Sequence, residues 1–273
     1  MNGEADSALS AACSQRMQEP MVVAVPAPAR TKHHHEVLIL IQTTLIFLVG
    51  ALFVLTFIVQ PYRIPSGSME DTLLIGDFLL VNKTVFAPPG EWKHLLAYEP
   101  VKHDDIVVFH YPVDASLYLV KRVIGVPGDE LHLHRGLVYV DGQLQREPFA
   151  LYIPTYANQF RDEFPTPTYI DPGVISRWWM QMQQDVHKGQ LTIPDGEYFV
   201  LGDNRNDSLD SRYWGLVPRQ NIVGEPFLVY FSVVTASRSE ITGVSGNRLP
   251  RERGWWNAFL GSARWGRIFH VIH

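Results

Sequence analysis

The stretch "PYRIPSGSMEDTLLIGDFLLVNK" (residues 61–83) separates a long apolar run from a series of short β-like segments. Pro65 and Gly67 restrict the backbone around its two serines, so we expect a shaped loop here rather than the start of a helix. The loop offers two hydroxyl groups, those of Ser66 and Ser68. Either could be a nucleophile, and the local sequence does not choose between them.

The apolar run before this loop, residues 37–60, contains no charged residue. At about 1.5 Å per residue it is long enough to cross a hydrocarbon core of about 30 Å, which predicts a transmembrane helix. A cleaved signal sequence is disfavoured, because the run is too long and no small-x-small site follows it. Arg30 and Lys32 precede the run, so the positive-inside rule favours a flexible cytoplasmic tail over residues 1–36.

The residues after this span alternate in short runs separated by Gly, Pro and Asp, which predicts an antiparallel, barrel-like β domain over residues 61–142 and 193–235. Turns are expected at residues 135–136 and 141–142. The predicted strands lie within "FLLVNK" (78–83), "DIVVFHYP" (105–112), "LYLVKRVIGV" (117–126), "ELHLHRGLVYVDG" (130–142), "EYFVLGD" (197–203) and "FLVYFSV" (227–233).

Residues 143–192 break this rhythm and are interpreted as a smaller inserted subdomain, with one helix-like piece, "RWWMQMQQDVHK" (177–188). Trp178 and Trp179 in this piece are either core residues or an interfacial membrane contact. The fold class is therefore mainly β, with an insertion, preceded by one transmembrane helix.

The composition excludes several classes of protein. A net charge of -5 without a long Lys/Arg block argues against a nucleic-acid partner. Cys13 is the single cysteine, so the chain has no intrachain disulfide and no cysteine cluster for zinc. We expect no metal and no organic cofactor.

A serine hydroxyl needs a base before it can act as a nucleophile. The chain has no G-x-S-x-G motif and no serine with a lysine three positions later, while eleven histidines leave a Ser-His-Asp triad open. Lys121 lies within "LYLVKRVIGVPGD", where apolar neighbours predict burial and a lowered lysine pKa, as a base near neutral pH requires. The alternative is a strand lysine that reaches to solvent.

Four stretches, in order, resemble the conserved boxes of bacterial type I signal peptidases: "IPSGSMEDTLLIGDFLLVNK", "DIVVFHYP", "KRVIGVPGD" and "GDNRNDSLDSRYWGLV". The resemblance implies that Ser68 is the nucleophile and Lys121 the general base. It implies that Ser66 helps the Ser68 backbone N–H to bind the oxyanion, and that Ser208 orients the lysine.

The same resemblance assigns Asp210 and Arg212 to an ion pair that supports the Ser208 loop, with Arg122 as a further partner. It also assigns four residues to shallow pockets for small substrate side chains, although ordinary core packing is the alternative for each: Ile64, Pro65, Met69 and Val120.

The implied activity is that of a serine endopeptidase anchored by one span in a bacterial cytoplasmic membrane, with its catalytic domain on the outer, periplasmic side. Its expected partners are the lipid bilayer and secretory preproteins with small residues at the first and third positions before the cut. A self-cleaving Ser-Lys peptidase of the repressor type and an inactive membrane-tethered β binding module are the alternatives.

The sequence departs from the family pattern in three places. Asp104, in "HDDIVVF", stands where the family usually has glycine. Only one span is evident, so the two-span topology of some relatives does not transfer. The C-terminal segment, residues 236–273, carries Trp265 and Phe269 among arginines, and either lies in the membrane interface or packs back on the domain.

Overall fold

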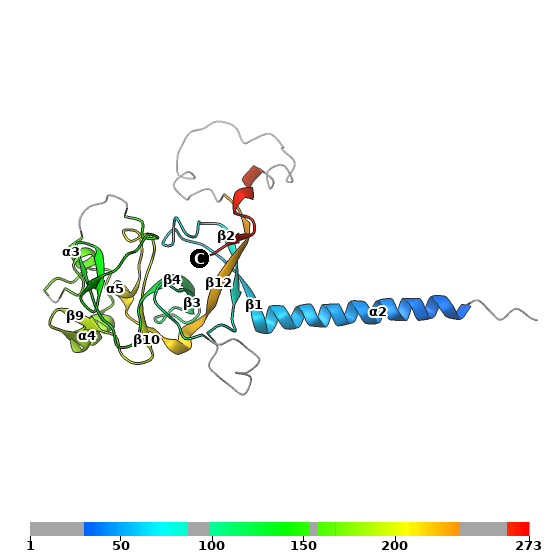
Figure 1. Cartoon of the computed structure of the whole chain (residues 1–273), viewed down its shortest axis with the longest axis horizontal. Coiled ribbons are helices and arrows are strands. Elements are labelled where there is room, and N and C mark those ends of the chain that lie inside the picture. Colours follow the sequence, from blue (N-terminus) through cyan, green and yellow to red (C-terminus); the bar gives the residue numbers. More distant parts are fainter. Residues whose placement is uncertain (1–29, 87–98, 153–157, 167, 235–260, 273) are drawn as a thin grey trace, which may run out of the picture. The chain divides into compact units, whose positions relative to one another are not determined.

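The computed structural model describes five stretches of the chain: residues 30–86, 99–152, 158–166, 168–234 and 261–272 (Figure 1). Most of the predicted tail (1–29) and residues 236–260 of the C-terminal segment lie outside the described residues. The chain divides after Gly50 into two compact units.

The described part of the first unit is helical. Helix α2 (Arg30–Phe53) continues as a single π-helical stretch, η1 (Val54–Ile58). The segment His35–Ile58 has a mean hydropathy of 2.6 and none of its side chains is buried. It is therefore long and apolar enough to cross a membrane, in agreement with the predicted span.

The end of this helix differs from the prediction, which extended it to Gln60. Residues 59 and 60 already belong to strand β1 (Val59–Arg63), which pairs with β2 (Asp77–Asn82). Pro61 explains the difference, because proline has no N–H for a helical hydrogen bond and disfavours helical geometry in the residue before it.

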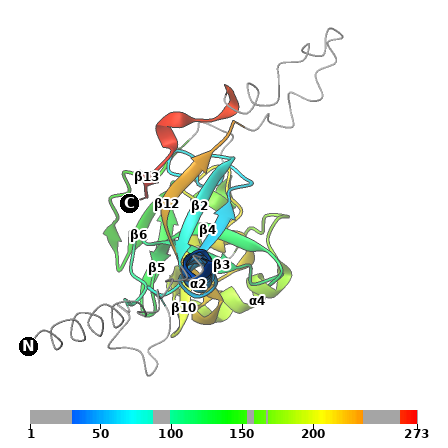
Figure 2. The ribbon, with the colours of Figure 1, turned by 90° about the vertical axis from the view of Figure 1, so that its right-hand side faces the viewer.

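The second unit is built on an eight-stranded sheet in which every pairing is antiparallel, so the predicted fold class is confirmed. The order is β1-β2-β12-β3-β4-β10-β11, with β13 on β12. Strand β12 pairs with β2 through one part and β3 through another, with register shifts between them (Figure 2). The remaining strands are β3 (Ile106–His110), β4 (Tyr118–Gly125), β10 (Glu197–Leu201), β11 (Val217–Pro218), β12 (Ile222–Ser232) and β13 (His270–Val271).

A second, five-stranded sheet has the order β7-β6-β5-β9-β8. It starts at residue 130, so the predicted boundary of the insertion at residue 143 is wrong. The reason is that β5 and β6 pair with β9 and β7 of the insertion, and with no strand of the larger sheet. The strands are β5 (Glu130–His134), β6 (Leu137–Val140), β7 (Gln143–Leu144), β8 (Val186–His187) and β9 (Gln190–Thr192).

The predicted turns of this second sheet are confirmed. Arg135 and Gly136 have φ values of 51° and 78°, and Asp141 and Gly142 have values of 52° and 73°. Two successive positive φ angles are the signature of the tight hairpin turn that matches the twist of its strands.

Short helices complete the second unit. In α4 (Ser176–Asp185), Trp178 and Met182 are one helical turn apart and both are buried. The core interpretation of Trp178 is therefore confirmed, and Trp179 packs partly buried against the same core. The other helices are α3 (Gln159–Asp162), α5 (Ser211–Trp214), η2 (Arg219–Asn221) and η3 (Trp265–Arg267).

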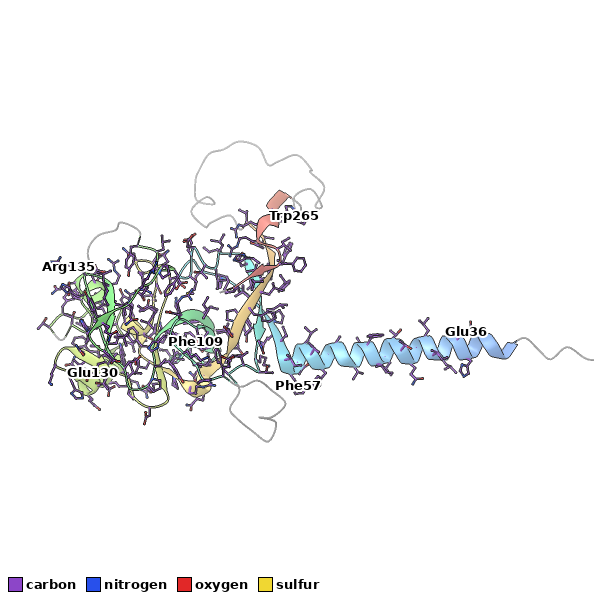
Figure 3. All side chains as sticks on the ribbon, viewed as in Figure 1. Glu36, Phe57, Phe109, Glu130, Arg135 and Trp265 are labelled. Carbon is purple, nitrogen blue, oxygen red and sulfur yellow. The ribbon has the colours of Figure 1, made fainter. Side chains whose placement is uncertain are left out.

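The interior holds two apolar clusters. The larger one includes side chains from both sheets and from α4, with Phe109 at its centre (Figure 3). The smaller one lies under the serine loop and joins Met69 and Leu73 of that loop to Leu79 and Val229 of the strands. Burial of each such side chain contributes about 2 kcal/mol, so this cluster holds the loop in place.

The described end of the chain packs on the β domain. Strand β13 pairs with β12, and Ile272 contacts the smaller apolar cluster. Arg267 makes a bidentate ion pair with Asp77, whose side chain is fully buried. For residues 261–272 the structure therefore supports packing on the domain.

Candidate active site

The serine loop is closed at its base by two backbone hydrogen bonds between Ile64, Gly76 and Asp77. The Ile64 N–H donates to the Asp77 carbonyl at 2.9 Å, and the Gly76 N–H donates to the Ile64 carbonyl at 3.0 Å. Within the loop, the Glu70 N–H donates to the Gly67 carbonyl at 2.9 Å. A tight turn therefore presents the half-buried Ser68 at the mouth of the loop.

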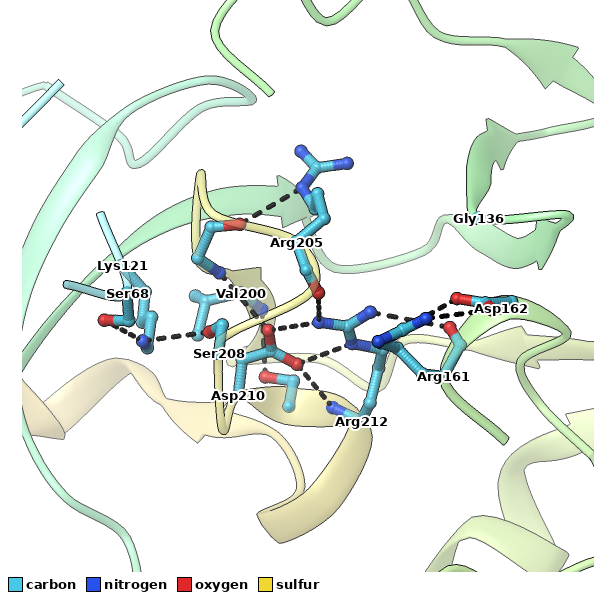
Figure 4. Close-up of polar contacts among 12 residues, drawn as sticks. Ser68, Lys121, Gly136, Arg161, Asp162, Val200, Arg205, Ser208, Asp210 and Arg212 are labelled. Atoms are coloured by element: carbon cyan, nitrogen blue, oxygen red, sulfur yellow. Dashed lines mark hydrogen bonds and ion pairs between the residues drawn. The ribbon is translucent and has the colours of Figure 1, made fainter. Parts of the chain in front are cut away.

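Lys121 lies on β4 and its side chain reaches Ser68. The Lys121 Nζ is 2.5 Å from Ser68 Oγ and 3.0 Å from Ser208 Oγ (Figure 4). The residue is only 3% exposed, so the prediction that it is buried is confirmed. Three residues that are far apart in the sequence thus form one connected set of polar atoms.

Burial lowers the pKa of Lys121 from 10.5 to about 8, because the ammonium form loses its hydration. Asp210, Asp203 and Asp207 partly oppose this effect, whereas the Arg212 guanidinium adds to it. A substantial share of neutral amine is then present near pH 8, and only the neutral amine can accept a proton from a hydroxyl.

The loop that carries Ser208 is held by a buried ion pair. Arg212 binds the Asp210 carboxylate through Nε at 2.8 Å and Nη2 at 2.7 Å, and the same Nη2 donates to the Arg205 carbonyl at 2.9 Å (Figure 4). Burial raises the pKa of Asp210, but the Arg212 guanidinium outweighs it and holds this pKa below its ordinary value. The carboxylate is therefore ionised and fixes the loop.

Arg122 does not join this pair, in contrast to the prediction. Its guanidinium binds Asp203, with Nε at 2.9 Å from Oδ1 and Nη2 at 2.7 Å from Oδ2. Asp203 also accepts a hydrogen bond of 2.6 Å from Thr72 Oγ1 in the serine loop. Asp203 therefore ties the serine loop to the strand that carries Lys121, because it contacts both.

Sequence reasoning missed this role of Asp203 and Thr72. The signal was present, since both residues lie inside the quoted boxes, but no local pattern says which of several carboxylates reaches which arginine. Asp104 keeps its turn in spite of replacing glycine, because it adopts a φ of 69°, and its carbonyl accepts a hydrogen bond of 2.8 Å from Arg122.

Close approach of the backbone makes this site compact at Gly202. A Cβ atom there would lie 2.3 Å from Ser208 Oγ and 2.4 Å from the Ser68 carbonyl oxygen. Only glycine lets the Ser208 loop approach the serine loop this closely.

A cleft of about 550 Å³ opens on these groups. All four residues predicted to line substrate pockets face it, although Ile64 and Met69 also belong to the smaller apolar cluster. Ser66 is exposed on its wall. The other lining residues include Tyr62, Tyr111, Leu117, Tyr118, Leu119, Leu209 and Trp214.

A serine hydroxyl against a buried lysine of lowered pKa, in a cleft on an antiparallel β fold, is the arrangement of a serine peptidase that uses lysine as its base. Comparison with known proteins agrees. The profile of the family described as "Signal peptidase, peptidase S26" matches residues 37–231.

Two curated relatives carry the name signal peptidase I. The protein from Pseudomonas aeruginosa is 35% identical over 194 residues, which cover 65% of this chain and 66% of that protein. The protein from Aquifex aeolicus is 32% identical over 218 residues, covering 68% of this chain and 81% of that one. A crystal structure described as a signal peptidase I from Enterococcus faecalis is 24% identical, with a TM-score of 0.31 and coverage of 46% and 97%.

The chain belongs to the peptidase S26 family of signal peptidases. It is thus a hydrolase of the class that removes signal peptides.

Proposed function

We propose that this protein is a membrane-anchored endopeptidase that removes N-terminal signal peptides from exported preproteins, with Ser68 as nucleophile and Lys121 as general base. The single observation that carries the proposal is the 2.5 Å contact between the Lys121 amine and the Ser68 hydroxyl, made by a buried lysine whose pKa is lowered to about 8. Both conditions for lysine as a base, proximity and a neutral form, are met together.

In the proposed reaction the Ser68 oxygen attacks the carbonyl carbon of the scissile bond while its proton moves to Lys121. The tetrahedral intermediate collapses, the proton passes from Lys121 to the departing amine, and the signal peptide stays on Ser68 as an ester. Lys121 then takes a proton from water, which attacks the ester and releases the signal peptide with a free carboxylate. The enzyme returns to its starting state.

The neighbours of this pair have supporting roles in the proposal. Ser208 accepts a hydrogen bond from Lys121 and keeps the amine directed at Ser68. Asp210 and Arg212 hold the Ser208 loop through their buried ion pair. Ser66, on the cleft wall, contributes a hydroxyl beside the Ser68 N–H for the developing oxyanion.

The substrate would bind as an extended strand between β1 and β4. Among the described residues β1 pairs with β2 alone, and β4 pairs with β10 only from Arg122 onward, so backbone groups of both strands near the cleft are free to bind a peptide. The shallow apolar lining favours small side chains at the first and third positions before the cut. The proposed pocket residues are Ile64, Pro65, Met69 and Val120.

The proposed location is a bacterial cytoplasmic membrane, spanned once by the segment His35–Ile58, with the β domain on the outer face. Arg30 and Lys32 before the span support this direction through the positive-inside rule. A nucleophile tethered close behind a span meets cleavage sites that follow the apolar segment of a preprotein.

Cleavage of a preprotein in detergent by the full chain tests this proposal. Ser68→Ala and Lys121→Met should abolish turnover, whereas Ser66→Ala should retain part of it. Ser176→Ala and Lys102→Ala are matched controls, because both residues are exposed and lie away from the cleft. Undiminished cleavage by either dyad variant contradicts the assignment, and binding without turnover in the wild type would favour an inactive binding module.

A further inference from the structure

Asn204 contacts two consecutive peptide groups of the serine loop from behind. Its backbone N–H donates to the Ser68 carbonyl at 3.1 Å, and its side-chain Nδ2 donates to the Gly67 carbonyl at 3.4 Å. Asn204 is 1% exposed and does not line the cleft. It therefore acts on the serine loop and not on anything bound in the cleft.

The contact with Gly67 decides where the Ser68 N–H points. In a planar trans peptide the carbonyl of one residue and the N–H of the next point in opposite directions. The Gly67 carbonyl is held from behind by Asn204 and by the Glu70 N–H at 2.9 Å. The Ser68 N–H is thereby turned away from Asn204, and it has no acceptor among the described residues.

The Asn204 side chain is unfavourable for stability as it stands. Its Oδ1 is buried and finds no hydrogen-bond partner in the described part of the chain. A buried acceptor without a partner costs about 1–3 kcal/mol. Turning the amide over does not help, because it would place Oδ1 against the Gly67 oxygen. What the side chain supplies is its donor end, directed at Gly67.

Asn204 is itself fixed from the opposite side by Leu151. The Leu151 N–H donates to the Asp203 carbonyl at 2.7 Å, and the Arg205 N–H donates to the Leu151 carbonyl at 3.0 Å. These bonds form a short parallel bridge around Asn204. A residue that holds an adjacent turn with its side chain needs such a rigid backbone.

We infer that Asn204 is a positioning residue for the oxyanion site: it orients the Gly67–Ser68 peptide so that the Ser68 N–H faces the oxygen of the tetrahedral intermediate. The inference rests on the proposed function of Ser68. Asn204 touches neither substrate nor reacting atoms, so its loss should affect the transition state far more than substrate binding.

The test compares Asn204→Leu with the wild type, using the full chain in detergent. Leucine keeps the size of the side chain and removes both the donor and the unpaired acceptor. Asn204→Ala is a second variant in case the branched side chain does not fit. Asn221→Leu is the matched control, because Asn221 also donates through Nδ2 to a backbone carbonyl, that of His110 at 3.1 Å, and does not line the cleft.

Two probes separate positioning from structure. The first is a peptide boronate with alanine at the first and third positions, which forms a tetrahedral adduct on an active serine. The second is the same peptide with a reduced, non-cleavable bond, which reports binding alone. Values of kcat and KM for a preprotein and the melting temperature complete the set.

We expect Asn204→Leu to lower kcat by about 10- to 100-fold, since removal of a whole oxyanion donor costs about 100- to 1,000-fold. Boronate affinity should fall by a similar factor, while KM, affinity for the reduced peptide and the melting temperature change little. Asn221→Leu should leave kcat and boronate affinity unchanged.

Unchanged kcat and boronate affinity in both Asn204 variants would overturn the inference, as would equal losses for both peptides together with a lower melting temperature. Ser68→Ala tells these failures from failure of the proposed function. If Ser68→Ala is inactive while Asn204→Leu behaves as wild type, only the positioning role is wrong. If Ser68→Ala still cleaves, the proposed function itself is wrong.

Discussion

Lys121 Nζ lies 2.5 Å from Ser68 Oγ although the two residues are 53 positions apart in the chain. The contact is made by a lysine that is 3% exposed, so water does not compete for its amine. Such burial disfavours the ammonium form and leaves a neutral amine beside a hydroxyl. The protonation state of this amine is therefore the quantity that pH controls in this protein.

Activity should follow the neutral form of Lys121. We expect kcat/KM for preprotein cleavage to rise about tenfold per pH unit below pH 8 and to level off above it, because the pKa of Lys121 is lowered to about 8. Initial rates between pH 5.5 and 10 measure this. A rise centred near pH 6.5, the ordinary range of histidine, would contradict a lysine base.

The same pKa has an effect on stability. Between pH 8 and 10.5 the unfolded chain holds the Lys121 proton and the folded protein does not, so the free energy of unfolding rises with pH in this window. The shift corresponds to about 3 kcal/mol, at about 1.4 kcal/mol per pKa unit. The difference in melting temperature between wild type and Lys121→Met should change over this window alone. The same difference at pH 7 and pH 10.5 would rule out a lowered pKa.

Gly202→Ala should inactivate the enzyme, because the new Cβ would lie 2.3 Å from Ser208 Oγ and 2.4 Å from the Ser68 carbonyl oxygen. Overpacking of this kind typically costs about 1–3 kcal/mol and displaces neighbouring groups. We expect kcat to fall at least about 100-fold, since a displacement of about 1 Å can cost that much. Gly266→Ala is the control, because a Cβ added at Gly266 would meet nothing within 4 Å. Full activity of Gly202→Ala would show that the two loops need not approach so closely.

Arg267 should be important for stability, because it is bidentate on the buried Asp77 carboxylate and also donates to the Thr72 carbonyl at 3.0 Å. Arg267→Leu leaves a buried charge with weaker compensation, from Ser232 at 2.6 Å and Arg264 at 3.8 Å. We expect a loss of about 3 kcal/mol, measured by thermal unfolding.

A double-mutant cycle with Asp77→Asn gives the control for this ion pair. Once the carboxylate is removed, replacement of Arg267 should cost much less than in the wild type. Additive losses would mean that the C-terminal stretch is held by β13 and its apolar contacts instead.

Much of the fold could be predicted from local patterns. Strand alternation in residues 105–112 and 117–126, and turn chemistry at Asp141 and Gly142, are short-range properties, and the structure has β3, β4 and the hairpin turn there. The boundary of the smaller sheet could not be predicted in this way. Which strands share a sheet depends on pairing over long sequence distances, and β5 shows no local sign that its neighbour is β9.

The site divides along the same line. The sequence by itself determined an apolar span, a rigid turn with two serines, and a lysine among apolar residues, because each depends on near neighbours and the chemistry of single side chains. Only the tertiary structure decided that the lysine reaches Ser68, that Arg122 pairs with Asp203, and that Asn204 supports the serine turn. These are contacts between distant segments, and their geometry exists only when both sheets and their loops are folded together.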